Sequence, residues 1–376
     1  MSFLWYILCL FGCQQTSSQP NDSDLNRDTE STSMDVEEDS QDSALIDDLI
    51  QEPTSITYQL AVVGDVMMDS HIARYIQSHG VDYPWEDVQT FLTDATFAIA
   101  NLETSVSTRG ESTKSERFGF RSHPDTLQGL VNAGIDIVST ANNHILDYGP
   151  DAHLDTLEHL ESYNIHQMGS GENISQAEAP VMMVHQGQHL CFIGYSDILP
   201  KRSWEAKEDR QGVASLKPPH LPRVYQNIES LKSDGTCDQL FMNIHWGYEY
   251  SDYYSKKQRR LARSFIDHGV DGIIGHHPHV LQGMELYKGK PILYSLGNFV
   301  FLVGSKEARN TGVFLLDFED GSFTGGKIVP IRVYKCKANL IEVDSSRAED
   351  IFTKLNKLSK RNGIQVDLEG NITLHP

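Results

Sequence analysis

The stretch IIGHHPHVLQGMELYKGKPILYSLGNFVF at residues 273–301 decides the fold class of this chain. An apolar run ends at Gly275, and three histidines follow at once: His276, His277 and His279. A short apolar run that stops at a glycine is typical of a buried strand that leads into a loop. Histidine is a common metal ligand, and a His-x-His pair points two imidazoles into one small volume. The stretch therefore predicts a metal-binding loop at a strand end; a polar surface loop that happens to be rich in histidine is the alternative.

Other apolar runs along the chain also end in residues that can bind a metal. We expect these strands at 58–64, 97–100, 135–140 and 240–244. In α/β folds, binding sites form where the carboxyl ends of strands meet. One aspartate after a strand is usually a turn or cap residue, and one histidine is usually a satisfied core residue, but a whole set of such strand ends is hard to explain in that way. The predicted metal ligands are Asp65, Glu103, Asn143, His245, His277 and His279.

The predicted ligand set combines carboxylates, an amide and imidazoles, and it contains no cysteine. Such a set suits Mn²⁺, Fe, Zn²⁺ or Mg²⁺, with Mn, Fe or Zn preferred, and argues against a structural zinc site. The set exceeds the needs of one tetrahedral ion, so two ions that share a ligand are the natural arrangement, able to activate a water and stabilise an anionic transition state. His144 would then serve as general acid, with Asp147 as the residue that orients it.

The rest of the chain alternates further strands and helices, which predicts an α/β fold. We assign one body to residues 56–345 and a C-terminal helix and tail to 346–376. Helices are expected at 70–78, 125–133, 152–163, 221–232, 255–268 and 347–359. Additional strands are expected at 182–184, 190–195, 292–295, 313–318, 327–333 and 340–343.

The formal charge of −21 is unevenly distributed along the chain. Residues 14–55 hold twelve acidic side chains and one arginine, which leaves −11 on this segment and −10 on the rest. The segment is rich in Ser, Asp, Glu, Gln and Thr and nearly free of aromatic residues, so it cannot bury enough apolar surface to fold. We predict a disordered acidic linker at 14–55. Neither part carries the basic stripe expected of a nucleic-acid binder, so no nucleic-acid partner is expected.

The first thirteen residues, MSFLWYILCLFGC, are typical of an export signal. Their apolar run at 3–11 is too short to span a bilayer and fits the hydrophobic region of a signal peptide. The final LFGC resembles a bacterial lipobox, which makes Cys13 the predicted lipidation site. We therefore expect an exported lipoprotein anchored to the membrane of the cell envelope. An uncleaved N-terminal anchor or a misassigned start codon is the alternative.

Cysteine usage predicts no disulfide framework. The chain has five cysteines, which are too few and too scattered for one, and no CxxC is present. Cys191, inside LCFIGY, is expected to be a small buried strand residue.

A set of motifs in a fixed order resembles the CapA/PgsA family of bacterial poly-γ-glutamate capsule biosynthesis proteins. These motifs are GDVMMD (64–69), ANLE (100–103), ANNHILDYG (141–149), HWGYEY (245–250), GHHPH (275–279) and YSLGNFVF (294–301). The resemblance covers residues 58–318. It implies a branch of the calcineurin-like metallophosphoesterases, with a four-layer α-β-β-α sandwich and a dinuclear metal site.

The resemblance assigns roles to individual positions. Asp65 matches the aspartate of the first motif, but Met67 stands where a histidine is expected, and Glu103 stands where the second motif has a bridging aspartate. Residues that match the family directly are Asn143, His144, His245, His277 and His279, with His276 as the rival for one of the last two places. The two departures leave open whether one ion or two are bound.

Three residues are candidates for substrate binding. Arg121 carries a fixed charge suited to a carboxylate or phosphate, although a solvated loop arginine is an equal alternative. Glu249 could orient His245 from behind. Asn298 is placed to line the pocket, but its turn would also favour an asparagine.

The resemblance implies a role in poly-γ-glutamate synthesis, transport or processing. The expected partners are an anionic polymer or phosphorylated substrate and membrane-bound capsule-synthase subunits. If the site is catalytic, metal-activated water would attack a phosphodiester or an amide. The alternative is a non-catalytic accessory protein that holds or guides the polymer and uses the metal as a carboxylate clamp. A hydrolase is favoured by His144, and a binding protein is favoured by Met67.

Overall fold

The computed structural model of the protein describes residues 55–113 and 119–375. The predicted signal peptide at 1–13, its lipidation site Cys13 and all but the last residue of the acidic linker lie outside these ranges. Within them, no helix combines the length and the apolar character that crossing a membrane would require.

One large sheet holds the first ligand strands. Its members are β1 (Thr57–Val66), β2 (Phe97–Leu102), β5 (Ile137–Ser139), β6 (His166–Met168), β15 (Asn298–Val300), β16 (Asn310–Glu319), β17 (Ser322–Tyr334), β18 (Lys337–Leu340), β19 (Ile364–Val366) and β20 (Asn371–Leu374). The strand order is β19-β20-β17-β16-β1-β2-β5-β6, with β15 also paired to β1 and β18 to β17. β1, β2, β5 and β6 are parallel, whereas β16 pairs antiparallel with β1.

A second sheet carries the histidine-rich strand ends. Its members are β8 (Val181–His185), β9 (Gln188–Ser196), β11 (Gln239–His245), β12 (Gly272–His276), β13 (Met284–Tyr287) and β14 (Lys290–Leu293). The order is β13-β14-β12-β11-β9-β8, and its four central strands are parallel. Two small ladders complete the strands: β3 (Ser105–Val106) with β4 (Arg121–Ser122), and β7 (Ser170–Gly171) with β10 (Gly212–Val213).

The two sheets pack face to face, and the alternation of side chains along β1 explains how. Successive residues of a strand point to opposite faces. Leu60 and Val62 share one apolar core with Phe241 of the second sheet. Ala61 and Val63 instead join the core beneath the helices on the outer face. Because β1 is buried on both faces, it is a continuous apolar run in the sequence.

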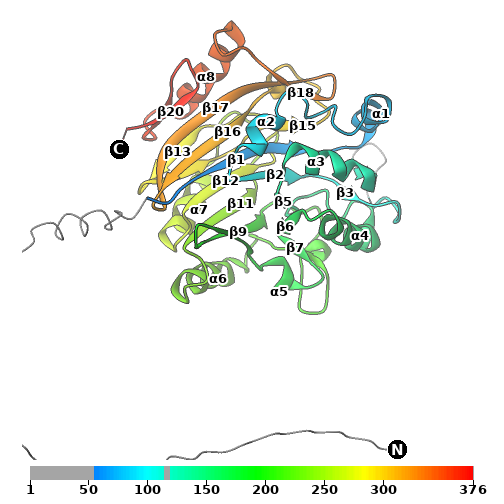
Figure 1. The fold of residues 1–376 in the computed structure, drawn as a ribbon. Coiled ribbons are helices and arrows are strands. Elements are labelled where there is room, and N and C mark those ends of the chain that lie inside the picture. The colour runs from blue at the N-terminus through cyan, green and yellow to red at the C-terminus, as the bar shows by residue number, and fades with distance from the viewer. Residues whose placement is uncertain (1–54, 114–118, 376) are drawn as a thin grey trace, which may run out of the picture. The chain divides into compact units, whose positions relative to one another are not determined.

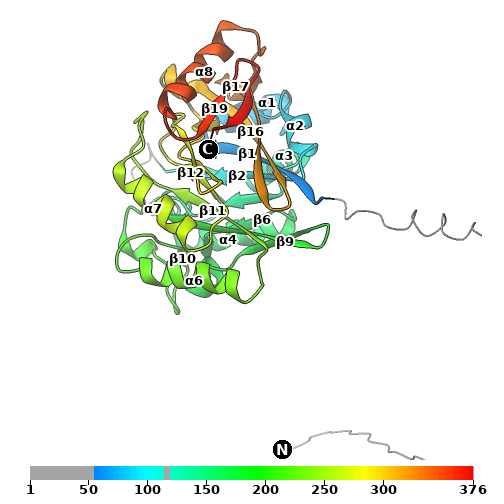
Figure 2. The ribbon, with the colours of Figure 1, turned by 90° about the vertical axis from the view of Figure 1, so that its left-hand side faces the viewer.

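Helices cover both outer faces of the sandwich (Figures 1 and 2). The helices that share a core with the first sheet are α1 (Ser70–His79), α2 (Gln89–Thr93), α3 (Leu127–Ala133) and α4 (Gly149–Ser162). Those that share a core with the second sheet are α5 (Ile174–Ala177), α6 (Leu221–Ser233) and α7 (Lys256–Asp267). The four-layer α-β-β-α architecture predicted from the resemblance is confirmed.

The C-terminal segment is part of the sandwich. Helix α8 (Ser346–Leu358) places Ile351, Phe352 and Leu355 in the core between the two sheets. Strand β20 then pairs antiparallel with β17, with Ile372 opposite Gly326. Residues 55–375 therefore form one compact unit, and the boundary that the sequence suggested near residue 345 does not divide it.

A disulfide that the cysteine spacing did not reveal joins Cys191 to Cys237, 46 residues apart in the sequence. Cys191 is a fully buried residue of β9, as expected. The parallel pairing of β9 with β11 places Leu240 opposite Cys191, and this register brings Cys237 within bonding distance. The bond thus depends on strand register, which the linear spacing does not show. Cys336, also buried, is a free thiol.

A buried histidine of α4 makes the stability of the fold sensitive to acid. Among the described residues, the hydrogen-bond partners of the His153 ring are uncharged: Nε2 lies 3.0 Å from Ser170 Oγ and Nδ1 lies 3.3 Å from Gln211 Oε1. Burial lowers its pKa to about 4. An unfolded chain takes up this proton near pH 6.5, so it binds more protons than the folded chain between pH 6.5 and 4.

We therefore expect the free energy of unfolding to fall as the pH drops from 6.5 to 4, with His153 alone contributing about 3 kcal/mol of that loss. Replacing His153 by glutamine removes the titration, so the His153→Gln variant should lose less stability over the same range. Urea titrations at pH 7, 5.5 and 4.5 measure this difference. Parallel stability curves for the two proteins would contradict the assignment.

Candidate metal centre

Strand ends from both sheets converge on one buried cluster of carboxylate, amide and imidazole groups. In the first sheet, Asp65 at the end of β1 lies in register with Asn101 of β2. In the second sheet, His245 at the end of β11 lies in register with His276 at the end of β12. Glu103 follows β2 directly and is fully buried. The convergence of strand ends predicted from the sequence is therefore present.

A close backbone approach shapes the edge of this cluster. A side chain on Gly64 would place its Cβ 2.0 Å from the carbonyl oxygen of Gly297, so only glycine fits there. This approach lets β15 pair with the end of β1, with Asn298 opposite Asp65. Asn298 then holds His279: its Oδ1 lies 3.0 Å from His279 Nδ1, and its Nδ2 donates to the His279 carbonyl at 2.9 Å.

Glu103 lies at the middle of the cluster. Its Oε1 is 3.5 Å from His245 Nε2, 3.8 Å from His279 Nε2 and 3.9 Å from His144 Nε2. These imidazoles come from three separate segments, the end of β11 and two loops, and each has a ring nitrogen near the same carboxylate oxygen. A cation held there would be ligated directly by Glu103, His245 and His279, with the His144 ring beside it.

Asp65 occupies the neighbouring position. Its Oδ2 is 3.0 Å from His279 Nδ1, and its Oδ1 accepts a hydrogen bond from Asn101 Nδ2 at 2.8 Å. Burial alone would raise the pKa of Asp65, but interactions with His276 and His279 outweigh burial and hold the pKa well below its usual value. Asp65 is therefore a buried anion.

The described part of the chain contains three groups of side chains that could hold a metal ion. Within each group, the ligand atoms lie within 4.8 Å of one another. The groups are Glu103 with His245 and His277, Asp65 with Glu103 and His279, and Glu249 with His277 and His279. Glu103, His277 and His279 each belong to two of the groups, and of these only the Glu103 carboxylate has two oxygens with which to bridge two ions. Asn143 adds an amide oxygen, Oδ1, that lies 2.7 Å from His245 Nε2. The residues thus fit one divalent ion, or two that share a ligand.

The protonation of His277 also fits a metal ligand. Burial, and then the neighbouring His279, lower the pKa of His277 to about 3, so its imidazole is neutral. A neutral imidazole is the form that binds metals. The buried Nδ1 of His277 has no hydrogen-bond partner among the described residues. His277 and His279 both have positive φ angles, 95° and 57°, which turn the loop back at the cluster. Such strained backbone gathers at functional sites.

The carboxylates around His279 favour the protonated, positively charged form of its imidazole. Burial would lower the pKa of His279, but the carboxylates of Glu103 and Asp65 raise it to about 9. His245, which is also buried, has its pKa lowered well below the usual value by burial and by the nearby His277. The carboxylate half of the cluster thus attracts a cation, while His245 and His277 offer neutral nitrogens.

His144 and Asp147 form a hydrogen-bonded pair at the edge of the cluster. His144 Nδ1 lies 2.6 Å from Asp147 Oδ2, which also accepts the Phe120 backbone N–H at 3.0 Å. The ring of His144 packs on Phe120, with centroids 4.4 Å apart. Nδ1 is thereby fixed and Nε2 faces the cluster, which is the arrangement of an oriented general acid or base.

The sequence analysis missed the amides that hold the ligands in place. Asn101 bonds to Asp65, and its Oδ1 accepts from Asn142 Nδ2 at 3.2 Å. Asn142 Oδ1 in turn accepts the backbone N–H of His144 at 3.0 Å. Both asparagines are fully buried. The sequence feature that could have identified them is that each is a polar residue that closely follows a predicted strand.

The structure revises the candidates for substrate binding. Arg121 is not brought to the cluster by any described contact: its guanidinium donates to the carbonyls of Arg109 and Gly110 and lies over the ring of Tyr148. These contacts hold the Arg121 side chain against the loop that contains Arg109 and Gly110. Glu249 is an exposed residue. Its carboxylate belongs to the same ligand group as His277 and His279, and His245 is not in that group. Asn298 positions His279, as described above.

His276 and Met67 occupy the two positions that the sequence left open. His276 directs Nδ1 at Asp65 Oδ1, 3.5 Å away, and belongs to none of the three ligand groups. His277 and His279 are thus the better ligand candidates. Met67 is buried, and its sulfur accepts the backbone N–H of Asp69 at 3.2 Å. A soft thioether at this position is a poor ligand for Mn²⁺ or Mg²⁺.

The sequence is similar to bacterial proteins of capsule biosynthesis. Residues 59–302 match the family model for the bacterial capsule synthesis protein PGA_cap. The capsule biosynthesis protein CapA of Bacillus anthracis is 29% identical over 277 residues, 73% of this chain and 67% of that protein. The PGA biosynthesis protein CapA of Bacillus subtilis is 27% identical over 297 residues, 78% of this chain and 77% of that protein.

Likeness among solved structures is more distant. The NAD nucleotidase of Haemophilus influenzae is 12% identical and has a TM-score of 0.44, with 81% of this chain and 66% of that chain covered. The family assignment rests on the sequence matches.

Proposed function

The chain belongs to the bacterial capsule synthesis protein family, and we propose that it acts in the biosynthesis of an anionic capsule polymer through a divalent-metal centre that hydrolyses a phosphodiester or amide bond. The observation that carries the proposal is the position of Glu103, whose Oε1 faces three imidazoles at 3.5 to 3.9 Å. Relatives named for capsule and polyglutamate biosynthesis support the polymer as the substrate class.

The chain's own residues have distinct tasks in this proposal. Asp65, Glu103, Asn143, His245, His277 and His279 would hold the metal, with Glu249 near the last two. A bound divalent ion supplies an activated water and polarises a substrate oxygen. His144 Nε2 would hold or deliver the proton that the leaving group needs. Asp147, 2.6 Å from His144 Nδ1, fixes the tautomer and orientation of the ring.

A non-catalytic role remains the second candidate. Met67 removes an imidazole from the first motif, which weakens one of two metal positions. A singly occupied centre could clamp carboxylates of the polymer without cleaving it. One relative is itself named a probable polyglutamine synthesis accessory protein.

Elemental analysis of the full-length protein, together with hydrolysis of bis(p-nitrophenyl) phosphate in the presence of Mn²⁺, tests the proposal. We expect one to two equivalents of Mn, Fe or Zn and measurable turnover. Metal without turnover on this ester and on γ-glutamyl amides would favour the clamp. Absence of bound metal after reconstitution would contradict both.

We further propose that the protein is exported and anchored through Cys13, where it could meet membrane-bound synthase subunits. The apolar run at 3–11 supports this proposal. The Cys191–Cys237 disulfide also supports it, because such bonds persist in oxidising compartments.

Replacing Cys13 by serine should move the protein from the membrane pellet to the soluble fraction, because a lipid chain could no longer be attached. Fractionation of cells followed by immunoblotting measures the shift. Cys9→Ser changes a cysteine in the same apolar run and serves as the matched control, which should stay in the pellet. A Cys13→Ser protein that still pelleted with membranes would refute acylation as the anchor.

A further inference from the structure

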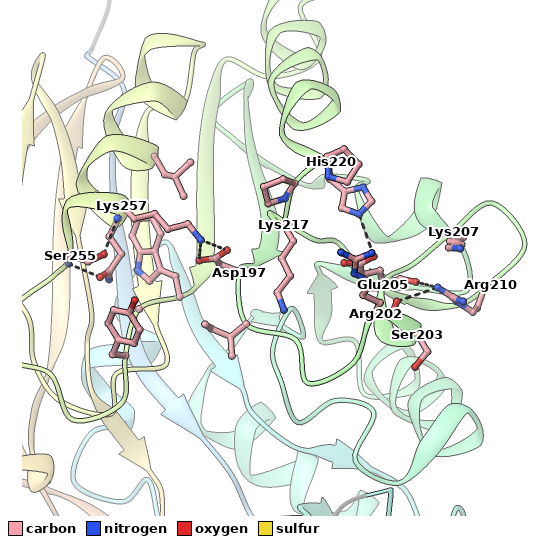
Figure 3. Close-up of a pocket in the computed structure, with 18 residues that line it drawn as sticks. Asp197, Arg202, Ser203, Glu205, Lys207, Arg210, Lys217, His220, Ser255 and Lys257 are labelled. Atoms are coloured by element: carbon pink, nitrogen blue, oxygen red, sulfur yellow. Dashed lines mark hydrogen bonds and ion pairs between the residues drawn. The ribbon is translucent and has the colours of Figure 1, made fainter.

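A cavity of about 950 Å³, within the size range of ligand pockets, is lined in part by the residues that directly follow His245. Segments from four parts of the chain line it: the loop after β9, the turn at Arg202–Trp204, the loop before α6, and the stretch from Trp246 to the start of α7. Figure 3 shows Lys217 reaching into the space between Asp197 on one side and Arg202 and Glu205 on the other.

The acidic side chains of this cavity are already paired. Both oxygens of Asp197 lie within 2.7 Å of Lys257 Nζ. Glu205 Oε2 lies 3.3 Å from His220 Nε2. Lys257 thus neutralises Asp197, and Glu205 offsets at most one of the remaining cations that line the space.

Four cations of the cavity have no carboxylate partner among the described residues: Arg202, Lys207, Arg210 and Lys217. Lys217 Nζ donates only to the Leu199 carbonyl, at 2.9 Å. Arg210 is held by the carbonyl of Glu205 at 2.9 Å, and its buried Nε has no hydrogen-bond partner. A cluster of unpaired cations on a chain of formal charge −21 concentrates a positive potential in one place. Such a cavity selects an anion.

One wall of the cavity is continuous with the metal centre. The backbone N–H of Asp197 donates to the carbonyl of the ligand His245 at 2.9 Å. Trp246, Gly247 and Tyr248 then line the cavity directly after His245. Gly247 is two residues from His245, so their Cα atoms are at most about 7 Å apart.

At its other end, near Tyr250, the segment that follows His245 contacts the loop that carries His277 and His279. The Tyr250 N–H donates to the Pro278 carbonyl at 2.8 Å, and its ring lies 6.1 Å from that of His279. Tyr248 and Tyr250 are 71% and 62% exposed, so they border an open surface. The segment 245–250 therefore joins the metal centre to the basic cavity.

We propose that the cavity is an anion-binding subsite for the substrate of the metal centre, and that it holds a carboxylate-bearing unit of a polymer whose scissile bond lies at Glu103 and His144. This proposal rests on the proposed function in placing the polymer at the metal centre. It makes the preferred substrate an extended polycarboxylate with several charges. A small ester that carries one charge would leave the subsite empty.

Binding of defined γ-glutamate oligomers by the metal-loaded full-length protein tests this proposal. The test variant is Arg202→Gln with Lys217→Met, which removes two cations and keeps most of their side-chain volume. The matched control is Lys327→Met with Lys360→Met, which removes two exposed cations outside the cavity. Calorimetric titration with oligomers of two, five and ten units gives the affinity for each length.

The wild-type protein and the control should bind the ten-unit oligomer at least tenfold more tightly than the two-unit oligomer. The cavity variant should lose roughly tenfold or more of its affinity for the long oligomer, because each charged hydrogen bond contributes about that factor. Its affinity for the short oligomer and its metal content should not change. Equal affinity for the ten-unit oligomer in the cavity variant and control would overturn the proposal.

Two further measurements separate this proposal from the proposed function. A polyphosphate of equal charge that bound more tightly than the glutamate oligomer would overturn the assignment to polycarboxylates. If the wild-type protein hydrolyses neither ester nor amide but the cavity variant still loses affinity for the long oligomer, hydrolysis is refuted and the subsite stands.

Discussion

Replacing Glu103 by glutamine should lower the affinity for the metal by at least about 100-fold, with most bound metal lost on dialysis. Glu103 belongs to two of the three ligand groups, and its Oε1 faces His144, His245 and His279. Glutamine keeps the shape of the side chain and removes its charge. Elemental analysis after dialysis, and the rise in melting temperature on adding Mn²⁺, measure the loss.

Glu249→Gln is the matched control for this experiment. Glu249 belongs to one ligand group only and is exposed, so its loss should cost much less affinity. The metal-free Glu103→Gln protein should remain folded, because the change removes a buried charge and leaves the core intact. Metal content equal to that of the wild type would refute Glu103 as the shared ligand.

Replacing His144 by alanine should lower kcat for bis(p-nitrophenyl) phosphate by roughly 10²- to 10⁴-fold, the usual contribution of a general acid or base. Its Nδ1 is bound to Asp147 at 2.6 Å, which leaves Nε2 to exchange a proton. Metal content should stay unchanged, because His144 belongs to none of the ligand groups. Steady-state kinetics and elemental analysis on the same preparation measure both quantities.

Asp147→Asn separates proton transfer from positioning. The amide can still contact His144 but can no longer stabilise its charged form, so the alkaline limb of the pH–rate profile should move to lower pH while metal content is retained. If His144→Ala lost its metal together with its activity, His144 would be a ligand and the role of general acid would fall.

The convergence of the candidate ligands could be predicted because each stands at the end of a strand or in the loop that follows it. A buried apolar run fixes where the strand ends, and the next polar residue is then confined to the edge of the sheet, as with Asp65, Glu103 and His245. The four-layer fold followed from the order of the same motifs. The sequence could show which residues lie at the edge of the sheet. It could not show which side chains from other strands lie next to them.

The features that escaped prediction all depend on distances between segments far apart in the chain. Asn101 and Asn142 act through side chains that meet only when β2 and β5 are in register. The partner of Cys191 follows from the pairing of β9 with β11. Arg121 has the charge of a substrate ligand, but two carbonyls of a neighbouring loop hold its guanidinium. The basic cavity gathers residues spread from Asp197 to Leu261, and its four cations without a carboxylate partner among the described residues belong to none of the motifs.

The origin of the ligands in two separate sheets has a consequence for how the protein matures. Asp65 and Glu103 belong to the first sheet, and His245 and His277 to the second. Neither layer alone presents a complete set, so the ion can enter only after the two halves of the chain have docked. A bound ion would link the two sheets through its ligands. We therefore expect metal loading to be a late step that reports successful assembly, because a chain whose halves are still apart offers no complete ligand set.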